Sequence, residues 1–322
     1  MILSSIEDVA KLVGVSTTTV SRALNNKSYV SKKTKQKIEE AVKELNYVPN
    51  KVAKSLSSKR TNIVGVIIPS IIDPIYSEEI NTIEKVLKEK GVRILLCLCP
   101  RNSHQYELEL KNMLNSYIDG IISAVYDFPV TMAEENVPFV QLGGGKVDYS
   151  RKVNVITDDY EVGQAAIKLI EKGKHKKVIV QHGPLSLSEE QDRLDAIVYA
   201  LNGSEVNYEL QLVDQDDPYG IEGTQNLFKD FKDFDVVLSR NDQNGYQVVL
   251  EAQRRGIMVP SELKVIGYGG SQFLANMNSP MTTISINPSK IGNKVAELTI
   301  SMLAEDSKKK NQQISVPISI IN

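Results

Sequence analysis

The apolar and polar positions of the chain follow two periodicities in succession. In the first 46 residues, apolar side chains recur at helical spacing in Ile6–Val13, in a segment that begins after Ser16, and in Lys32–Leu45. Gly14 interrupts the pattern, and Ser16 and Ser31 are suitable helix caps. Two short helices joined by a glycine-containing turn predict a helix-turn-helix, whose second helix enters the major groove of DNA.

From about residue 62 onward, short apolar runs alternate with amphipathic segments. The runs include IVGVIIP, VRILLCLCP, KVIVQHG and LKVIGYG. Strands that alternate with helices at this spacing predict parallel sheets built from βαβ units. About ten strands are too many for one small domain, so we expect two similar doubly wound lobes. A ligand is then expected between them, outside the carboxyl ends of the strands.

The two parts of the chain differ in charge. Residues 1–60 contain 12 Lys and Arg against 5 Asp and Glu, whereas residues 61–322 contain 26 against 35. A basic module joined to a larger acidic one is typical of a nucleic-acid-binding head on a regulatory body, although a solvated basic surface is the simpler alternative.

Several function classes lack support in the sequence. No run of about 18 apolar residues is present and the N-terminal segment is charged, so we expect a cytoplasmic protein with no membrane partner. Cys97 and Cys99 alternate with leucines and are expected in a buried strand. Leu142–Val147 departs from a phosphate-binding loop, and no catalytic or metal-ligand spacing occurs. We therefore expect no enzyme activity, no cofactor and no metal.

The head segment SIEDVAKLVGVSTTTVSRALNN, followed by VSKKTKQKIEEAVKELNYVPNKVAKSL, resembles the N-terminus of the LacI family of bacterial transcriptional regulators. The resemblance continues through IVGVIIPSIIDPIYSEEI, SRNDQ and GIMVPSELKVIGYG. It implies a small all-α helix-turn-helix head with a hinge helix, followed by two doubly wound parallel-sheet lobes of periplasmic-binding-protein type. It also implies a homodimer on roughly palindromic double-stranded operator DNA.

This organisation gives the expected domain boundaries. The head is residues 1–48, the hinge helix or linker is 49–60, and the effector-binding and dimerisation body is 61–322. Within the body we expect an N-lobe of about 61–157 plus 288–312, and a C-lobe of about 158–287 plus 313–322.

The resemblance also implies DNA contacts. Thr17, Thr18 and Arg22 fall at base-reading positions, where arginine has bidentate reach for guanine and threonine offers a hydroxyl or a methyl group. The polar positions expected to contact phosphates are Ser16, Ser21, Asn25, Ser31, Thr34, Tyr47 and Asn50. Capping is the alternative role for any single serine or threonine among them. Val52 and Ala53 match the face that pairs two hinge helices, and Leu56 matches the leucine that wedges into the minor groove.

The effector pocket departs from the sugar-binding members of the family. The matching or loop positions expected to bind effector are Asp73, Tyr76, Arg193, Tyr219, Asn241 and Asp242. Gly143, Gly269 and Ile286 stand where sugar-binding members often place acids or amides. We therefore expect a sugar or sugar-phosphate effector with another hydroxyl pattern, larger or phosphorylated, since Arg193 can hold an anion.

The resulting hypothesis is a repressor of a carbohydrate-utilisation operon that a small effector controls. Two alternatives remain open: the same DNA-binding role with a protein co-regulator of the catabolite-control type, and a small-molecule binding protein without DNA function.

Overall fold

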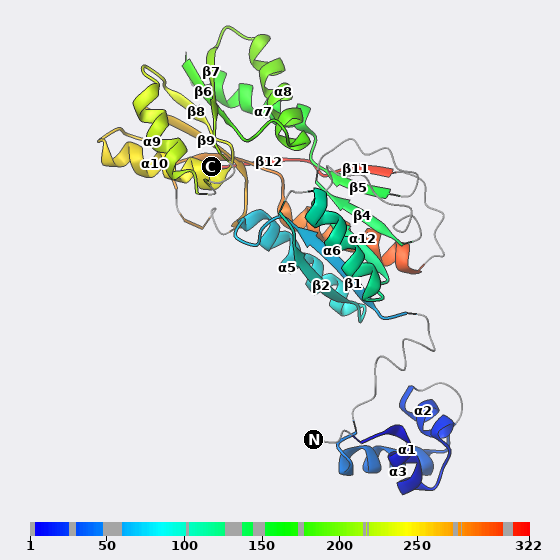
Figure 1. Ribbon diagram of the computed structural model, residues 1–322. Helices are drawn as coiled ribbons and strands as arrows, with labels where there is room; N and C mark the ends of the chain where they lie inside the picture. Colours follow the sequence, from blue (N-terminus) through cyan, green and yellow to red (C-terminus); the bar gives the residue numbers. More distant parts are fainter. Residues whose placement is uncertain are drawn as a thin grey trace. The chain divides into compact units, whose positions relative to one another are not determined.

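The computed structural model describes most of the chain: residues 4–25, 30–47, 60–100, 103–125, 137–143, 152–172, 177–214, 217, 219–272, 276–277, 279–304 and 312–322. The chain divides into two compact units, Met1–Thr61 and Asn62–Asn322 (Figure 1). Among the described residues, no helix is long and apolar enough to cross a membrane.

The first unit contains the three helices that the apolar spacing predicts: α1 Ile6–Val13, α2 Thr17–Asn25 and α3 Lys32–Glu44. The side chain of Ser5 accepts a hydrogen bond from the backbone of Asp8, and the Asp8 carboxylate accepts one from the backbone of Ser5, which fixes the start of α1. Gly14 ends this helix in the left-handed conformation with φ of 75°. The core of the unit consists of small and medium side chains: Val9, Ala10, Val20, Ala23, Ile38, Ala41 and Tyr47.

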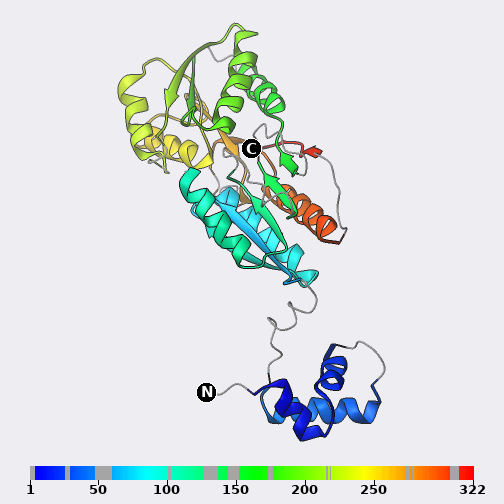
Figure 2. The ribbon, with the colours of Figure 1, turned by 45° about the vertical axis from the view of Figure 1, so that its right-hand side comes forward.

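The first lobe of the second unit is built on a parallel six-stranded sheet of order β11-β5-β4-β3-β1-β2. Its strands are β1 Ile63–Ile68, β2 Arg93–Leu98, β3 Gly120–Ser123, β4 Phe139–Leu142, β5 Lys152–Ile156 and β11 Gln312–Ser315. Val66 packs with α5 (Pro74–Glu89) and α12 (Pro288–Ala304), whereas Ile67 packs with α6 (Ser103–Asn115). Helices therefore cover both faces of the sheet, as Figure 2 shows for α6 and α12.

The second lobe repeats this plan with the strand order β12-β10-β9-β8-β6-β7, in which only β12 is antiparallel to its neighbour among the described strands. Its strands are β6 Lys177–His182, β7 Asn207–Leu212, β8 Val236–Leu238, β9 Lys264–Gly269, β10 Thr282–Ser285 and β12 Ser319–Ile321. Its helices are α7 Asp159–Glu171, α8 Ser188–Asn202, α9 Ile221–Asp230 and α10 Asp242–Arg254. Val178 and Val180 pack with α7 and α8, while Ile179 packs with α9 and α10, so helices again cover both faces.

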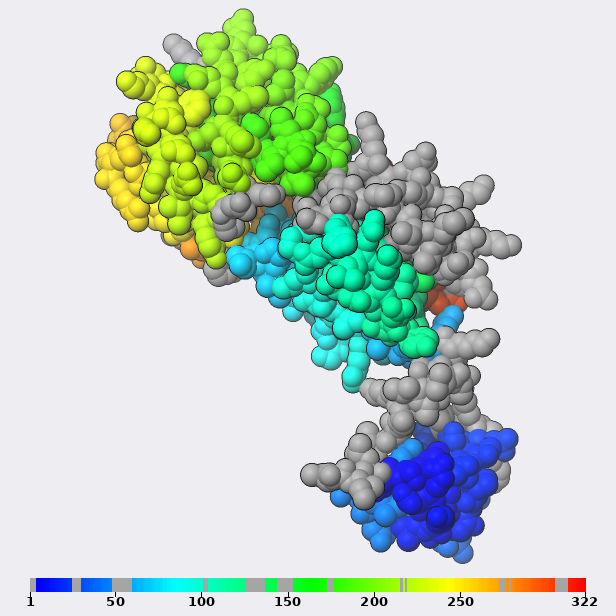
Figure 3. Space-filling model, viewed as in Figure 1, coloured from blue at the N-terminus to red at the C-terminus, as the bar shows by residue number. Residues whose placement is uncertain are grey.

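The chain passes between the two sheets after β5, after β10 and after β11. Asn287 connects two of these passages: its side-chain amide donates to the Pro317 carbonyl at 2.7 Å and its amide oxygen accepts from the Ser319 hydroxyl at 3.0 Å. Residues 313–315 pair with β5, so the last passage follows Ser315, three residues later than the expected boundary at 312. In Figure 3 the lobes are the cyan part and the green-and-yellow part of the second unit.

Candidate DNA-binding and effector sites

One face of α2 is packed and the opposite face is open. Val20 and Ala23 are buried in the head core, whereas Thr17, Thr18 and Arg22 are exposed. Thr18 and Arg22 lie four residues apart and therefore share one side of the helix. The helix can thus present the three predicted base-reading side chains on a face that the core leaves free.

Ser16 and Ser31 cap the second and third helices. The Ser16 hydroxyl oxygen accepts from the Thr19 backbone N–H at 3.2 Å and lies 2.9 Å from the Thr19 hydroxyl. Ser31 makes the same contacts with Thr34, at 3.2 and 2.8 Å. Capping, the alternative that the sequence left open, is therefore present for both serines. Their helix N-termini are also suited to phosphate oxygens, so the predicted phosphate contacts stay predictions.

The remaining predicted head contacts differ in how the structure places them. The Tyr47 side chain is 9% exposed and packs in the head core, where its backbone N–H donates to Val42. Ser21 is half-buried on α2. The side chain of Asn25 and the whole of Asn50, Val52, Ala53 and Leu56 lie outside the described residues. The predicted hinge contacts therefore stay predictions.

A cavity of about 560 Å³ lies between the two lobes of the second unit. Its walls include residues that directly follow strands of both sheets: Pro69 after β1, Gly143 after β4, Thr157 after β5 and Ile286 after β10. This is the expected place for a ligand in doubly wound folds, and the volume is typical of a small-molecule site.

Four of the six predicted effector contacts line this cleft: Asp73, Tyr76, Arg193 and Asn241. Asp73 and Asn241 also cap helices, since Asp73 accepts from the Ile75 backbone and Asn241 from the Asn244 backbone, each at 2.9 Å.

Two predicted contacts, Tyr219 and Asp242, are not among the described residues that line the cleft. Tyr219 is 47% exposed. Asp242 is buried and accepts from the Gly270 backbone N–H at 2.6 Å. Burial raises the pKa of Asp242 to about 6 against the lowering effect of that hydrogen bond.

Three positions carry Gly or Ile where sugar-binding members of the family often have acids or amides, and these positions also lie at or near the cleft. Gly143 and Ile286 line it. Gly269 has φ of 130°, and a Cβ there would come within 2.7 Å of the Ile75 side chain. A side chain at position 269 would therefore strain the backbone and require the Ile75 side chain to move.

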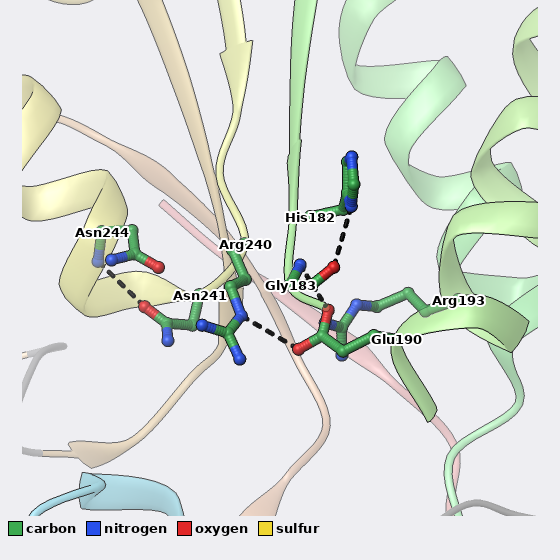
Figure 4. Close-up of polar contacts among 7 residues, drawn as sticks. All are labelled: His182, Gly183, Glu190, Arg193, Arg240, Asn241 and Asn244. Atoms are coloured by element: carbon green, nitrogen blue, oxygen red, sulfur yellow. Dashed lines mark hydrogen bonds and ion pairs between the residues drawn. The ribbon is translucent and has the colours of Figure 1, made fainter. Parts of the chain in front are cut away.

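A buried ion triad lies in the wall formed by the second lobe, and the sequence reasoning missed two of its members. The carboxylate of Glu190 accepts from Arg193 at 2.5 Å, from Arg240 at 3.0 Å and from the Gly183 backbone N–H at 3.0 Å (Figure 4). The Arg193 guanidinium carbon also lies 4.4 Å from the ring centroid of Tyr268. Although burial opposes it, the two guanidinium groups lower the pKa of Glu190 to about 2.

Three further carboxylates that the sequence reasoning missed also line the cleft: Glu79, Asp159 and Glu189. Burial raises the pKa of Asp159 to about 6 despite the opposing charge of Arg193. Glu79 is 3% exposed, and its Oε2 atom has no hydrogen-bond partner among the described residues.

The pKa of Glu79 is raised well above its ordinary value by burial and by the charges of Asp73, Glu78 and Glu189. A sequence signal for this residue exists. Glu79 lies one turn after Ile75 and one turn before Ile83, which is on the apolar side of α5. A carboxylate in an apolar helix stripe is costly unless a ligand or partner uses it.

Comparisons with known proteins agree with both parts of the fold. Residues 5–50 match the family described as bacterial regulatory proteins, lacI family, and residues 166–322 match the periplasmic binding protein-like domain. The ribose operon repressor of Lactococcus lactis is 28% identical, with 99% of this chain and 97% of that protein covered. The sucrose operon repressor of Pediococcus pentosaceus is 27% identical, with 98% and 97% covered.

Solved structures give the same result for the fold. The lac repressor dimer bound to operator and the anti-inducer ONPF has a TM-score of 0.86 at 24% identity, with 100% of this chain and 98% of that chain covered. The transcriptional regulator CelR in complex with cellobiose has a TM-score of 0.69 at 22% identity, with 99% and 98% covered. The predicted fold class and resemblance are confirmed: the chain combines a lacI-family helix-turn-helix head with a periplasmic-binding-protein-like body, which is the organisation of the LacI-family transcriptional regulators, a family of non-enzymatic proteins.

Proposed function

We propose that the chain represses an operon for carbohydrate use by binding a palindromic operator as a homodimer, under the control of a small molecule in the interlobe cleft. The observation that carries this function is the open face of α2, where Thr17, Thr18 and Arg22 are exposed on a helix that Val20 and Ala23 seat in the head core. Residues 1–60 contain 12 basic and 5 acidic residues. This positive charge supports DNA binding, because phosphate neutralisation dominates protein–DNA affinity.

The exposed edges of the two sheets support a dimer. The edge strand β2 of the first sheet exposes Leu95 and Leu98 by 40% and 47%, and the edge strand β7 of the second sheet exposes Leu210 and Leu212 by 43% and 58%. An apolar edge strand is a site for association unless something covers it. A second copy related by a two-fold axis would cover both edges and present two heads to the half-sites of a palindrome.

A hydrogen bond between the two lobes offers a route for ligand control. Glu78 on α5 of the first lobe accepts from the Gln272 backbone N–H of the second lobe at 2.8 Å, and from the Ser289 hydroxyl at 2.6 Å. A ligand in the cleft can shift the equilibrium between lobe arrangements only if it binds one arrangement better. The neighbouring residue Glu79 lines the cleft itself, so ligand binding and the Glu78 contact involve the same turn of α5.

The hinge completes the proposed route from cleft to operator. We expect Val52 and Ala53 of two copies to pair on the operator, and Leu56 to insert into the central step of the minor groove. An inserted leucine unstacks the step at a cost of a few kcal/mol, which the additional contacts on kinked DNA offset. The cavity of about 560 Å³ favours a small molecule over a protein co-regulator as the controlling partner.

A gel shift with the DNA upstream of the chain's own gene and of the neighbouring operon tests this function. The full chain should shift such DNA in the presence of excess random DNA, and Arg22→Ala should lose this preference. Lys88→Ala, which removes a positive charge from an exposed position in the body, is the matched control and should behave as the parent chain. Equal affinity of the parent chain for operator candidates and random DNA would contradict the proposed function.

A further inference from the structure

We propose that the interlobe cleft selects an organic cation, namely a small ligand that carries a protonated amine, such as an amino sugar. The inference rests on the proposed effector cleft and goes further by assigning the charge and chemical class of its ligand. It replaces the expectation of a phosphorylated effector.

The charges around the cleft are unequal. Among the described residues, the lining contains five carboxylates and two guanidinium groups. The carboxylates are Asp73, Glu79, Asp159, Glu189 and Glu190, and the guanidinium groups are those of Arg193 and Arg240. Both guanidinium groups already bond to one of these carboxylates, Glu190. An anionic ligand would therefore meet arginines that already pair with Glu190 and an excess of negative charge. A cation would instead meet carboxylates able to form charge-assisted hydrogen bonds.

Glu79 supplies a second and independent observation. The residue is only 3% exposed, its Oε2 atom is buried, and it lines the cleft. Its Oε2 atom has no hydrogen-bond partner in the described part of the chain. A buried polar atom without a partner costs stability, and a donor supplied by the ligand would satisfy it. An ammonium group has three donors and a positive charge, which suits this oxygen.

The carboxylates come from both lobes. Asp73 and Glu79 belong to the start of α5 in the first lobe, whereas Asp159 and Glu189 belong to the starts of α7 and α8 in the second. Without a cation these groups repel one another across the cleft, and the charge of Glu189 is one of those that act on Glu79. An amine placed between the lobes converts this repulsion into attraction, so its binding favours one lobe arrangement.

The described lining of the cleft favours an organic cation over a metal ion. In the described ranges, no group of three or more His, Cys, Asp and Glu side chains could hold a metal ion. Apolar side chains, including Leu142, Ile286 and Ile291, also line the cleft and would contact a carbon skeleton. The lining is therefore suited to a compact organic body that carries an amine.

Calorimetry of the full chain with probes matched in shape tests the charge. The probes are D-glucosamine and D-galactosamine, their N-acetyl forms, D-glucose and D-galactose, the corresponding 6-phosphates, and spermidine as a non-sugar amine. We expect at least one amine to bind ten-fold or more tightly than its N-acetyl and hydroxyl counterparts. Sugar amines that bind better than spermidine would identify an amino sugar, and the reverse would identify a polyamine as the cation. A neutral or phosphorylated probe that binds as tightly as its amine, or the absence of amine binding, would overturn the inference.

A variant then tests the assigned residue. Glu79→Gln keeps the shape and removes the charge, so it should lower amine affinity at least ten-fold. The control is Glu84→Gln on the same helix, where the side chain is 43% exposed and pairs with Lys88. Unchanged amine affinity in Glu79→Gln would contradict the assignment. Amine binding by a chain that fails to select operator DNA would refute the proposed function alone, and operator binding without amine selectivity would refute this inference alone.

Discussion

The head and the cleft use charged side chains in opposite ways. The exposed face of α2 carries Arg22, and the packed core beneath it is apolar. In the cleft, Arg193 and Arg240 are largely buried and both bond to the buried carboxylate of Glu190. DNA is a large polyanion that approaches from outside, whereas a small ligand must be surrounded. Substitution of the exposed Arg22 should therefore change DNA binding with little effect on stability, whereas substitution of the buried Glu190 should change the stability of the body.

The largest expected effect comes from breaking the buried triad. Glu190→Ala leaves Arg193 and Arg240 buried without their carboxylate, so we expect the free energy of unfolding of the body to fall by about 3–5 kcal/mol. Glu251→Ala is the control, because Glu251 pairs with Arg254 and Arg255, which are 75% and 45% exposed. In urea denaturation, Glu251→Ala should lower the free energy of unfolding by about 1 kcal/mol or less. Equal losses for the two variants would contradict the contrast between buried and exposed charge.

Arg22→Ala should produce the next largest effect, on DNA binding alone. We expect a loss of about 1–3 kcal/mol per half-site and relaxed preference at one base pair. Because the side chain is exposed, the free energy of unfolding should change by about 0.5 kcal/mol or less. Fluorescence anisotropy with the operator and with singly substituted operators measures the binding term. An equal loss on operator and random DNA would show that Arg22 contributes charge without reading a base.

The two regions should also differ in their response to pH. Burial raises the pKa of Asp159 and of Asp242 to about 6, and raises that of Glu79 well above its ordinary value. A pKa that is higher in the folded state contributes stability at low pH that is lost as the pH rises through the folded value. The lowered pKa of Glu190, about 2, acts in the opposite sense, and its contribution is lost as the pH falls towards 2.

The body should therefore be more stable at pH 5 than at pH 7.5. Glu79→Gln should raise stability at pH 7.5 and flatten this dependence, as expected for a residue kept for ligand binding at a cost to the free protein. In the head, the backbone and side chain of Ser5 lower the pKa of Asp8, so no such gain at pH 5 is expected there. Urea denaturation of the full chain across this pH range would contradict the account if stability rose steadily from pH 5 to pH 7.5.

The smallest effect should come from Ser16, where a cap and a predicted phosphate contact coincide. Ser16→Ala removes the hydrogen bond to Thr19 and should destabilise α2 by about 0.5–2 kcal/mol. Ser16→Asp keeps a capping oxygen and adds a negative charge, so it should preserve the helix and weaken operator binding. Hydrogen exchange of α2 measures the first property and anisotropy the second. Undiminished operator binding by Ser16→Asp would leave capping as the role of Ser16.

The helices of the head could be predicted from the sequence because their boundaries depend on residues that are close together in the chain. The positions of Gly14, Ser16 and Ser31, with apolar residues at helical spacing, define three helices and the free face of α2 without any long-range contact. Tyr47 is the exception, since its packing in the head core depends on tertiary structure.

The cleft was predictable only in part because its geometry depends on distant strand ends. Glu190 and Arg240 are 50 residues apart and meet because β6 and β8 are neighbours in the sheet. Asp242 follows Asn241, but Asn241 is the N-cap of α10 with extended backbone and Asp242 is the first helical residue. Asn241 therefore lines the cleft while Asp242 bonds to the Gly270 backbone.

Operator affinity of the full chain in the presence of paired amine and N-acetyl probes tests both the proposed ligand and its control of DNA binding. Anisotropy titrations with D-glucosamine and N-acetyl-D-glucosamine, and with the galactose pair, compare the same sugar carrying a charged amine and a neutral, larger acetamide. We predict that an amine changes the operator Kd at least ten-fold while its N-acetyl counterpart does not, and that Glu79→Gln abolishes this difference. Equal effects of both members of each pair, or no effect of either, would contradict it.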